Sequence, residues 1–337
     1  MNKACPKIIG KNLTVAYGDY VLLQHADFTV NQGDVFIIMG ASGGGKSSLL
    51  RVLTGLMPPA EGEVIVDGEN FSGGDAAVRD KVMRRCGILY QSGALFSSMT
   101  LGENVALPLQ QYTDYSSRLI KELVDLKLAL VGLGGFNDFY PSEISGGMKK
   151  RAGLARALAL DPEILYFDEP SAGLDPVSSR HLDDLILDIN RSLGTTLVIV
   201  SHELASIFAV GSNSIFLDSE TKSIIGRGNP KELVKNPPNE TVYNFLTREG
   251  KNMVRKPNKT MIGLFLLLGS AVFVFILGVY VKRVFFPDNS NVVVMYFQES
   301  IKGLNVGSSV VFQGVEIGKV SRIDLVADME NTHFQHT

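Results

Sequence analysis

The sequence predicts an α/β fold, in which a parallel sheet carries helices on its faces and has an antiparallel β subdomain and a helical subdomain attached. Three short runs, Val35–Met39, Ile164–Phe167 and Thr196–Val200, are continuously apolar, as strands buried on both faces are. Because the last two runs each follow a stretch with helical patterning, they favour a parallel sheet. Residues 7–38 alternate apolar and polar positions between turn signals, which predicts antiparallel strands.

Composition and turn residues divide the chain further. A helix is expected at Ser47–Gly55, and residues 98–160 are predominantly helical in pattern, which predicts a separate helical lobe. The stretch Asn229–Lys259 is rich in Pro, Asn and charged residues and predicts one terminal helix followed by a linker. The predicted segments are a large domain at 1–247, a linker at 248–260, an apolar helix at 261–281, a linker at 282–290 and a partial all-β domain at 291–337.

Bulk composition narrows the class of protein. The chain has 337 residues, 45% of them hydrophobic, which is enough for a large buried core. Its net charge of −3 argues against a nucleic-acid binder, which normally carries a basic face. The two cysteines, Cys5 and Cys86, lie far apart without metal-ligand spacing, so the first domain suits a reducing cytosol.

The run Met261–Val281 contains no charged residue. As a helix, a segment of this length covers about 30 Å, the hydrocarbon thickness of a bilayer. Lys and Arg residues are more numerous before the run than after it, which favours a cytosolic N-terminal side. We therefore predict a single transmembrane helix, with residues 284–337 outside the cytosol.

A glycine-rich loop follows the first buried strand. It matches G-x-x-x-x-G-K-[ST], the pattern whose backbone N–H groups surround phosphate oxygens at the start of a helix. In this pattern Lys46 reaches the β- and γ-phosphates and the Ser47 hydroxyl binds Mg²⁺. The predicted ATP-binding loop comprises Gly40, Ala41, Ser42, Gly43, Gly44, Gly45, Lys46, Ser47 and Ser48.

Two acidic residues end the strand at Ile164–Phe167. Asp168 stands at the carboxyl end of the strand, where a carboxylate can hold Mg²⁺ directly or through water. The adjacent Glu169 is placed to polarise an attacking water molecule, as a general base does. The sequence thus places a phosphate-binding loop and an acidic pair at the ends of buried strands.

Together with these residues, several short motifs resemble the ATP-binding-cassette (ABC) ATPases over residues 7–247. Ser145-Gly146-Gly147 resembles the signature motif, and Ser171–Asp175 resembles the D-loop with its Asp175. Tyr17 resembles the aromatic residue that stacks on adenine, Gln91 the Q-loop glutamine, and His202 the switch histidine. The resemblance implies a P-loop ABC ATPase domain that hydrolyses ATP with Mg²⁺.

Family logic implies how these residues act. Two such domains form a dimer that encloses two ATP molecules, each between Lys46 of one copy and the signature of the other. Glu169 then acts as the general base and His202 contacts the γ-phosphate, while Lys46 stabilises charge on the phosphoryl group. The implied Mg²⁺ ligands are Ser47, Gln91 and Asp168.

Two positions depart from the usual ABC pattern. Ile144 replaces the Leu that commonly opens the signature, and Met148 replaces a Gln. The Met followed by basic residues, together with the segment Gln91–Phe96, resembles the lipid-transport branch associated with MCE proteins, the Mla system.

The segment after the apolar helix predicts three strands, near Val292–Phe297, Ser309–Gln313 and Val315–Ile323, with glycines at the turns. Its glycine and apolar spacing resembles the opening of an MCE domain, which implies a small β-barrel that assembles into rings around a lipid-conducting pore. Because three strands are marginal for an independent fold, we expect a fragment or a domain completed by a neighbouring chain.

The favoured interpretation is an ATP-binding subunit for phospholipid transport between bacterial inner and outer membranes. It places the ATPase in the cytosol and the MCE segment in the periplasm. The implied partners are a multi-span permease resembling MlaE, a second ABC domain, further MCE chains and phospholipid, and not nucleic acid. Two alternatives stay open: an ABC motor for another hydrophobic solute, and a membrane-tethered regulatory ATPase without a transport role.

Overall fold

The computed structural model describes residues 5–248, 259–285, 292–297 and 302–324. The chain separates into two units, Met1–Arg255 and Lys256–Thr337, which are treated individually below.

A six-stranded, mostly parallel sheet forms the centre of the first unit, in the order β10-β9-β3-β8-β7-β6. The antiparallel partner at its edge is β10, which pairs with β9. The three strands predicted from apolar runs are confirmed as β3, β7 and β8, and every residue of β3 and β8 is buried. The strands span Val35–Gly40 (β3), Cys86–Leu89 (β6), Ile164–Asp168 (β7), Thr196–Val200 (β8), Asn213–Asp218 (β9) and Ser223–Arg227 (β10).

An antiparallel sheet with the order β2-β1-β4-β5 covers one side of this core. Its strands span Pro6–Tyr17 (β1), Tyr20–Asn31 (β2), Glu61–Val66 (β4) and Glu69–Asn70 (β5). The antiparallel strands predicted in residues 7–38 are confirmed as β1 and β2, which are joined by a tight turn between Tyr17 and Tyr20. Apolar residues of both sheets share one buried cluster with helix α1, Lys46–Leu53.

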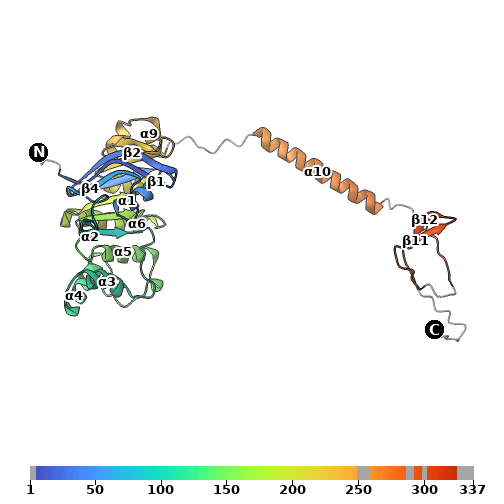
Figure 1. Ribbon diagram of the computed structural model, residues 1–337, viewed down its shortest axis with the longest axis horizontal. Coiled ribbons are helices and arrows are strands. Elements are labelled where there is room, and N and C mark those ends of the chain that lie inside the picture. The colour runs from blue at the N-terminus through green and yellow to red at the C-terminus, as the bar shows by residue number, and fades with distance from the viewer. Residues whose placement is uncertain (1–4, 249–258, 286–291, 298–301, 325–337) are drawn as a thin grey trace. The chain divides into compact units, whose positions relative to one another are not determined.

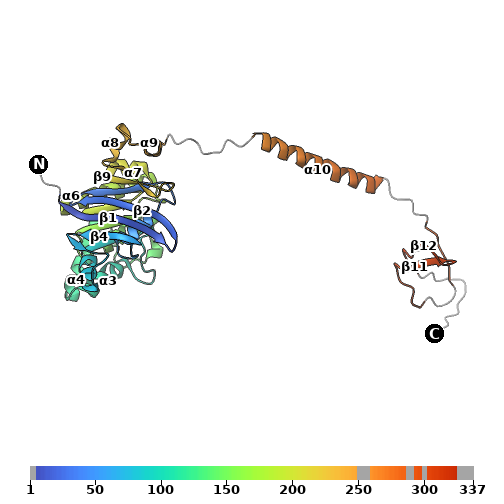
Figure 2. The same cartoon turned by 45° about the horizontal axis from the view of Figure 1, so that its top comes forward.

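Helices enclose the parallel sheet and extend it into a helical subdomain. The subdomain contains α3 (Leu101–Tyr112), α4 (Ser117–Leu130), the short 3₁₀ helix η1 (Pro141–Glu143) and α5 (Gly146–Ala157). Figures 1 and 2 place α3 and α4 at one end of the unit and α9 at the opposite end. The other helices are α2 (Ala76–Met83), α6 (Pro176–Leu193) and α7 (Leu204–Val210). The predicted lobe at 98–160 is helical, but its apolar side chains continue the core that underlies the parallel sheet.

A charged cluster ties the antiparallel sheet to the parallel one. Buried Lys7 on β1 pairs with Asp67 after β4 and with Glu163 before β7, at 2.8 Å and 2.5 Å. Arg85, which precedes β6, pairs with the same two carboxylates. The Arg85 and Lys7 hydrogen bonds hold the pKa of Glu163 at about 2, well below its usual range. The cluster therefore joins loops from three strands on one side of the molecule.

The expectation of a single terminal helix in 229–259 is wrong. Two short helices, α8 (Pro230–Lys235) and α9 (Glu240–Thr247), stand in its place. Pro237 and Pro238 separate them, because proline cannot continue a helix and restrains the residue before it. Asn239 then caps α9 by accepting a hydrogen bond from the Val242 amide. The predicted linker lies mostly outside the described residues.

In the second unit a 27-residue helix, α10, runs from Lys259 to Phe285. The predicted helix at 261–281 is thus confirmed as a helix. Among the residues that the structure describes, none of the helices combines the length and the apolar content that a membrane crossing needs. The transmembrane assignment is therefore not confirmed. The side chains of Met261, Ile262, Leu264, Leu266 and Val281 lie outside the described part.

Two of the three predicted C-terminal strands form a hairpin. Strand β11 spans Ser309–Phe312 and pairs with β12, Val315–Lys319, across a turn at Gln313 and Gly314. The expected strand at Val292–Phe297 is wrong, since that segment has no regular secondary structure. A strand needs a hydrogen-bonded neighbour, and within the described residues β11 and β12 pair only with each other. The predicted end of the domain, 325–337, lies outside the described residues.

Candidate nucleotide site

The carboxyl ends of four adjacent parallel strands create the candidate site. Strand β3 leads into the phosphate loop, β8 into His202, β7 into Glu169, and β6 into Gln91. In an open α/β sheet, ligands bind at this edge because loops from neighbouring strands converge there. Residues more than 150 positions apart in the sequence are thus brought to one side of the sheet.

The phosphate loop has the backbone that its glycines permit. Gly40, Gly43 and Gly45 have φ angles of 146°, 81° and 81°, in the region that side chains rarely adopt. A Cβ atom on Gly40 would lie 2.2 Å from the carbonyl oxygen of Leu217 on β9, so the close packing of loop and sheet requires glycine there. Gly45 then directly precedes α1, whose N-terminal amides face the loop.

Lys46 lies inside this loop and is only 7% exposed. Its ammonium group donates to the carbonyl oxygens of Gly40 at 3.0 Å and Ala41 at 2.8 Å. Burial lowers the pKa of Lys46, while the carboxylates of Glu169 and Asp168 oppose that shift. A cation held against the loop in this way can transfer its hydrogen bonds to phosphate oxygens, which are stronger acceptors than carbonyls.

Ser47 and Asp168 supply a pair of oxygen atoms next to the loop. The Ser47 hydroxyl donates to Asp168 Oδ1 at 3.1 Å. Burial raises the pKa of Asp168, and the Ser47 hydrogen bond opposes the rise. Hydroxyl and carboxylate oxygens are the ligands that Mg²⁺ prefers, and a divalent cation would relieve the buried charge of Asp168. This donor set fits the cation that the sequence implied.

Glu169 has a strained backbone, with a φ of 50° that non-glycine residues rarely adopt. Its amide donates to the Val200 carbonyl of β8 at 2.9 Å. One carboxylate oxygen lies 2.9 Å from Nδ1 of His202. The sheet edge therefore brings the expected general base and the expected switch histidine into direct contact. Asp168 and Glu169 also lie close enough to Lys46 for their charges to oppose the lowering of its pKa.

Tyr17 and Gln91, two further predicted nucleotide contacts, are both exposed. Tyr17, at the end of β1, is 47% exposed, and its hydroxyl accepts a hydrogen bond from Arg51 of α1 at 2.9 Å. The Ser48 hydroxyl lies 3.5 Å from the same oxygen. Gln91 is exposed two residues after β6, at the same sheet edge as Asp168. An exposed aromatic ring above the phosphate loop suits stacking against a planar base.

The signature lies elsewhere in the same chain, against the D-loop. Ser145 caps α5 by accepting from the Met148 amide at 3.3 Å. A Cβ atom on Gly147 would lie 3.8 Å from Leu174 and 3.7 Å from Ser178. Asp175 caps α6 by accepting from the amides of Val177 and Ser178, both at 3.0 Å. Ser145, Gly146 and Asp175 are exposed, so they are available to a second molecule.

Three basic side chains that the sequence did not single out support the site. Arg51 holds the Tyr17 hydroxyl, as described above. Lys150 of α5 is buried and donates to the carbonyl oxygens of Pro170 and Ala172, on both sides of the D-loop start. Arg156 of α5 donates to the Gly93 and Ala94 carbonyls, just after Gln91. In the sequence, Lys150 stands out only as part of the basic run after the signature. The carbonyl groups to which it donates are brought close to it by the fold.

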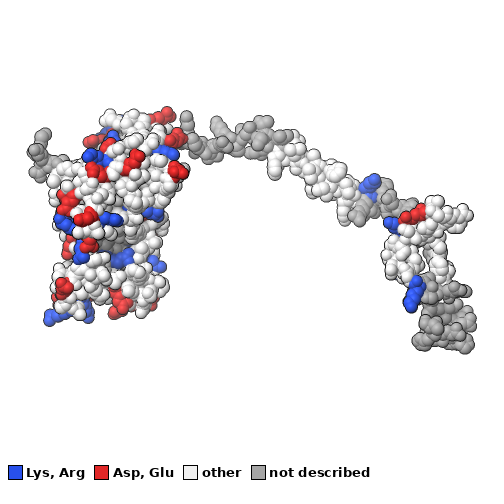
Figure 3. Space-filling view, in the orientation of Figure 1, with Lys and Arg blue, Asp and Glu red and all other residues white. Residues whose placement is uncertain are grey.

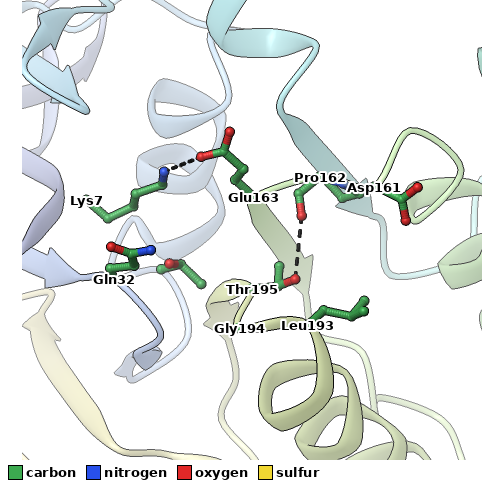
Figure 4. Close-up of a pocket in the computed structure, with 9 residues that line it drawn as sticks. Lys7, Gln32, Asp161, Pro162, Glu163, Leu193, Gly194 and Thr195 are labelled. Carbon is green, nitrogen blue, oxygen red and sulfur yellow. Dashed lines mark hydrogen bonds and ion pairs between the residues drawn. The ribbon is translucent and has the colours of Figure 1, made fainter.

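A cavity lies at the opposite edge of the sheet, where the parallel strands begin. It has a volume of about 430 Å³ and is lined by residues that precede β7 and β8, including Glu163 and Thr195, as well as by Lys7. Figure 4 shows the Lys7 ammonium directed at Glu163, and the Thr195 hydroxyl toward the Pro162 carbonyl. Lys7, Glu163 and Thr195 are thus already paired, and the cavity is separate from the candidate nucleotide site.

Family models match both units of the chain. The model described as ABC transporter matches residues 23–172, and the model described as MlaD protein matches residues 289–335. The first match includes the phosphate loop, the signature and the acidic pair. The second falls on the C-terminal segment and is a different family of protein.

Curated relatives resemble the first unit. The chain is 41% identical over 234 residues to the probable ribonucleotide transport ATP-binding protein mkl of Mycobacterium tuberculosis, covering 69% of this chain. It spans 64% of that protein, less than two thirds of its length. It is also 38% identical over 227 residues to the intermembrane phospholipid transport system ATP-binding protein MlaF of Escherichia coli, covering 67% of this chain and 84% of MlaF. For MlaF of Haemophilus influenzae the identity is 37%, with 73% and 92% covered.

Solved structures agree with the fold. A dimeric ATP-binding cassette in a post-hydrolysis state, bound to ADP and phosphate, aligns with a TM-score of 0.61 and 29% identity, covering 66% of this chain and 98% of the other. CbiO1 of Clostridium perfringens, part of an ABC transporter complex, aligns with a TM-score of 0.63 and 26% identity, covering 69% and 92%. On its fold, its motifs and these relatives, the chain belongs to the ABC transporter ATP-binding proteins of the MlaF type, with an MlaD-like segment following on the same polypeptide.

Proposed function

We propose that the chain is the ATP-hydrolysing subunit of a transporter that moves phospholipid between the inner and outer membranes of a bacterium. The observation that carries the proposal is the presence, on one chain, of the nucleotide site described above and of an MlaD-like segment. A motor and a lipid-handling module on one polypeptide are held at the same membrane by their linkage. ATP and Mg²⁺ are the proposed substrate and cofactor.

The proposed roles follow from the contacts at the sheet edge. Lys46 exchanges its loop carbonyls for β- and γ-phosphate oxygens and offsets charge on the transferred group. Ser47 and Asp168, with Gln91 from the neighbouring strand, hold Mg²⁺, which when bound neutralises phosphate charge. Glu169 accepts a proton from the attacking water. His202, through its hydrogen bond, fixes the orientation of that carboxylate.

A second copy of the chain completes the site in this proposal. The exposed residues Ser145, Gly146 and Asp175 surround the N-terminal ends of α5 and α6, which attract anions. Within one copy the two helix ends pack beside each other, where a Cβ atom on Gly147 would lie 3.7 Å from Ser178. A homodimer would therefore place the signature of one copy over the nucleotide of the other.

We propose further that α10 crosses the inner membrane, with the ATPase unit cytoplasmic and the MlaD-like segment periplasmic. Support comes from the absence of charge in 261–281 and from the exposure of the described apolar side chains along α10, such as Phe265 and Phe275 at 77% and 72%. Figure 3 shows the described part of α10 without charged atoms until near its C-terminal end. Exposed apolar surface of this extent needs lipid or protein around it.

The cargo is proposed from the MlaD-like segment and from the names of the MlaF relatives. The name of the mycobacterial relatives refers instead to ribonucleotide transport. One helix cannot enclose a pathway, so the proposal requires a multi-span permease resembling MlaE and further MCE chains that complete a ring.

Proteoliposomes test the proposal directly. The full chain and the membrane proteins that purify with it would be reconstituted with a fluorescent phospholipid, and transfer to acceptor vesicles would be followed with and without ATP. We expect ATP-dependent transfer that the Glu169→Gln variant abolishes. ATP-dependent movement of a fluorescent ribonucleotide with no phospholipid transfer would overturn the proposed cargo.

A further inference from the structure

A buried carboxylate with no part in the nucleotide site lies on helix α6. Asp183 is 7% exposed, and its Oδ2 accepts a hydrogen bond from the hydroxyl of Ser206 at 2.8 Å. Ser206 belongs to the first turn of α7 and is 4% exposed. A buried charge is costly unless it is paired or hydrogen-bonded, so the carboxylate of Asp183 depends on its hydrogen bond from Ser206.

The hydrogen-bonded chain continues to the D-loop. The hydroxyl oxygens of Ser206 and Ser171 are 3.3 Å apart, and Ser171 is 1% exposed. Ser171 follows Glu169 by two residues, and Ser206 follows His202 by four. Asp183, Ser206 and Ser171 therefore join the loop of the general base to the helix that follows the switch histidine.

The segment at Glu169 needs such support, because its φ of 50° persists only where the surroundings impose it. The Ala172 amide donates to the Glu169 carbonyl at 3.2 Å, which closes a tight turn. Lys150 holds the carbonyls of Pro170 and Ala172 at 2.6 Å and 2.5 Å. Ser171 is the side chain of this turn that points into the protein, where Ser206 and Asp183 hold it.

The ionised carboxylate orients the Ser206 hydroxyl. It can only accept, so it is the stronger acceptor for the single hydroxyl hydrogen of Ser206, which also faces the more distant Ser171 oxygen. A protonated carboxyl could donate to Ser206 instead, and this orientation would no longer be unique. Burial raises the pKa of Asp183 to about 6, and the carboxylates of Glu203, before α7, and Asp184, on α6, add to the rise. From α5, the Lys150 ammonium faces the same turn.

We propose that Asp183 is a positioning residue for ATP hydrolysis: through Ser206 and Ser171 it fixes the strained turn at Glu169 relative to His202. This inference rests on the proposed ATPase activity. Because Asp183 contacts neither the phosphate loop nor Tyr17 in the described hydrogen bonds, it affects turnover and not ATP binding.

The test compares ATPase rates of the detergent-solubilised full chain and its variants across about pH 5.5 to 8.5. Ser206→Ala and Ser171→Ala each break the chain with the loss of one oxygen atom. We expect kcat to fall about five- to twentyfold with KM for ATP unchanged, since small displacements of a catalytic group cost this much or more. Asp183→Asn keeps an acceptor for Ser206 that does not titrate, so its kcat should stay near the wild-type value and should lack the acid-side decline that we expect of the wild type.

Asp188→Asn is the matched control, because it removes the same charge from an exposed position on α6. It leaves His202 and Asp183 in place and should reproduce the wild-type profile. Wild-type kcat in both serine variants, or an acid-side decline in Asp183→Asn identical to that of wild type, would overturn the inference alone. A wild-type chain without ATPase activity would overturn the proposed function and this inference with it.

Discussion

At the scale of single residues, the candidate site depends on a carboxylate and a histidine that already touch. Glu169→Gln keeps the size of the side chain and a hydrogen bond to His202 but removes the base. We expect ATP hydrolysis to fall at least about 10²-fold, the usual contribution of a general base, while ATP binding is retained. Phosphate release and nucleotide binding measured on the same preparation check this. Hydrolysis at the wild-type rate would mean that another group accepts the proton.

Lys46 is expected to act at the binding step. In Lys46→Ala the phosphate oxygens lose a buried cation, which contributes charge-assisted hydrogen bonds. We expect ATP affinity to fall at least about tenfold, measured by equilibrium binding of a fluorescent ATP analogue. Lys121→Ala, at an exposed position on α4, is the control and should bind as wild type. Unchanged affinity in Lys46→Ala would contradict the role of the loop.

Asp183 also predicts how stability depends on pH. Its folded pKa of about 6 lies above the ordinary value of 3.8, so the folded state binds the proton more tightly than the unfolded state. The resulting stabilisation is present in full below pH 3.8 and is lost as pH rises through 6. Between about pH 5 and about pH 8 the loss is roughly 1 kcal/mol. Denaturant unfolding of wild type and Asp183→Asn should therefore diverge by this amount over the window, and parallel curves would contradict it.

Most of the candidate site could be predicted from the sequence, because each predicted nucleotide-binding loop has a short local pattern. The phosphate loop, the acidic pair at Asp168 and the Ser145 motif could all be located without the fold. The sequence did not reveal Arg51, Lys150 or Asp183, whose partners are distant in the chain. Their importance arises only when helices α1, α5 and α6 dock on the sheet, and no local spacing encodes that docking.

At the scale of elements, strand prediction succeeded where burial was continuous. Strands β3, β7 and β8 lie in the middle of the parallel sheet and read as apolar runs. Strands such as β10, half-exposed at the sheet edge, have no such pattern and were not anticipated. The strand expected at Val292–Phe297 was wrong because an apolar run alone cannot specify a pairing partner. Two prolines likewise divided one expected helix into α8 and α9.

The N-terminal end of α5 carries the prediction that distinguishes a shared site from a site within one copy. Ser145→Arg should block the signature, and Lys46→Ala should block the phosphate loop. Each variant alone is then inactive. In a mixed dimer, one site combines the intact Lys46 of one chain with the intact Ser145 of the other. About half of the dimers are mixed, and each of these has one intact site of two. Mixing should therefore restore ATPase activity to about a quarter of the wild-type rate.

The control for this experiment is Ser142→Arg, an exposed position three residues before the signature. It should be active alone, which shows that a bulky cation in this lobe is tolerated. If mixing the Ser145→Arg and Lys46→Ala chains restores nothing while each variant remains folded, the signature does not act across a dimer.

At the scale of the whole molecule, one chain carries an ABC ATPase unit, the helix α10 and an MlaD-like segment. The linkage fixes one ATPase unit to each MlaD-like segment, whereas the proposed assembly has two ATPase units and a ring of more than two such segments. Further MCE chains or a smaller ring would reconcile the two numbers. The cargo and the partner proteins therefore distinguish the proposed transporter from the alternatives. One preparation can identify both.

The most direct measurement is mass spectrometry of the lipids and proteins that purify with the full chain from its native membrane in detergent. The account predicts phospholipid enriched above a preparation of an unrelated single-span protein, together with a multi-span permease. ATPase activity without enriched phospholipid and without a permease would contradict it and would favour a membrane-tethered regulatory ATPase.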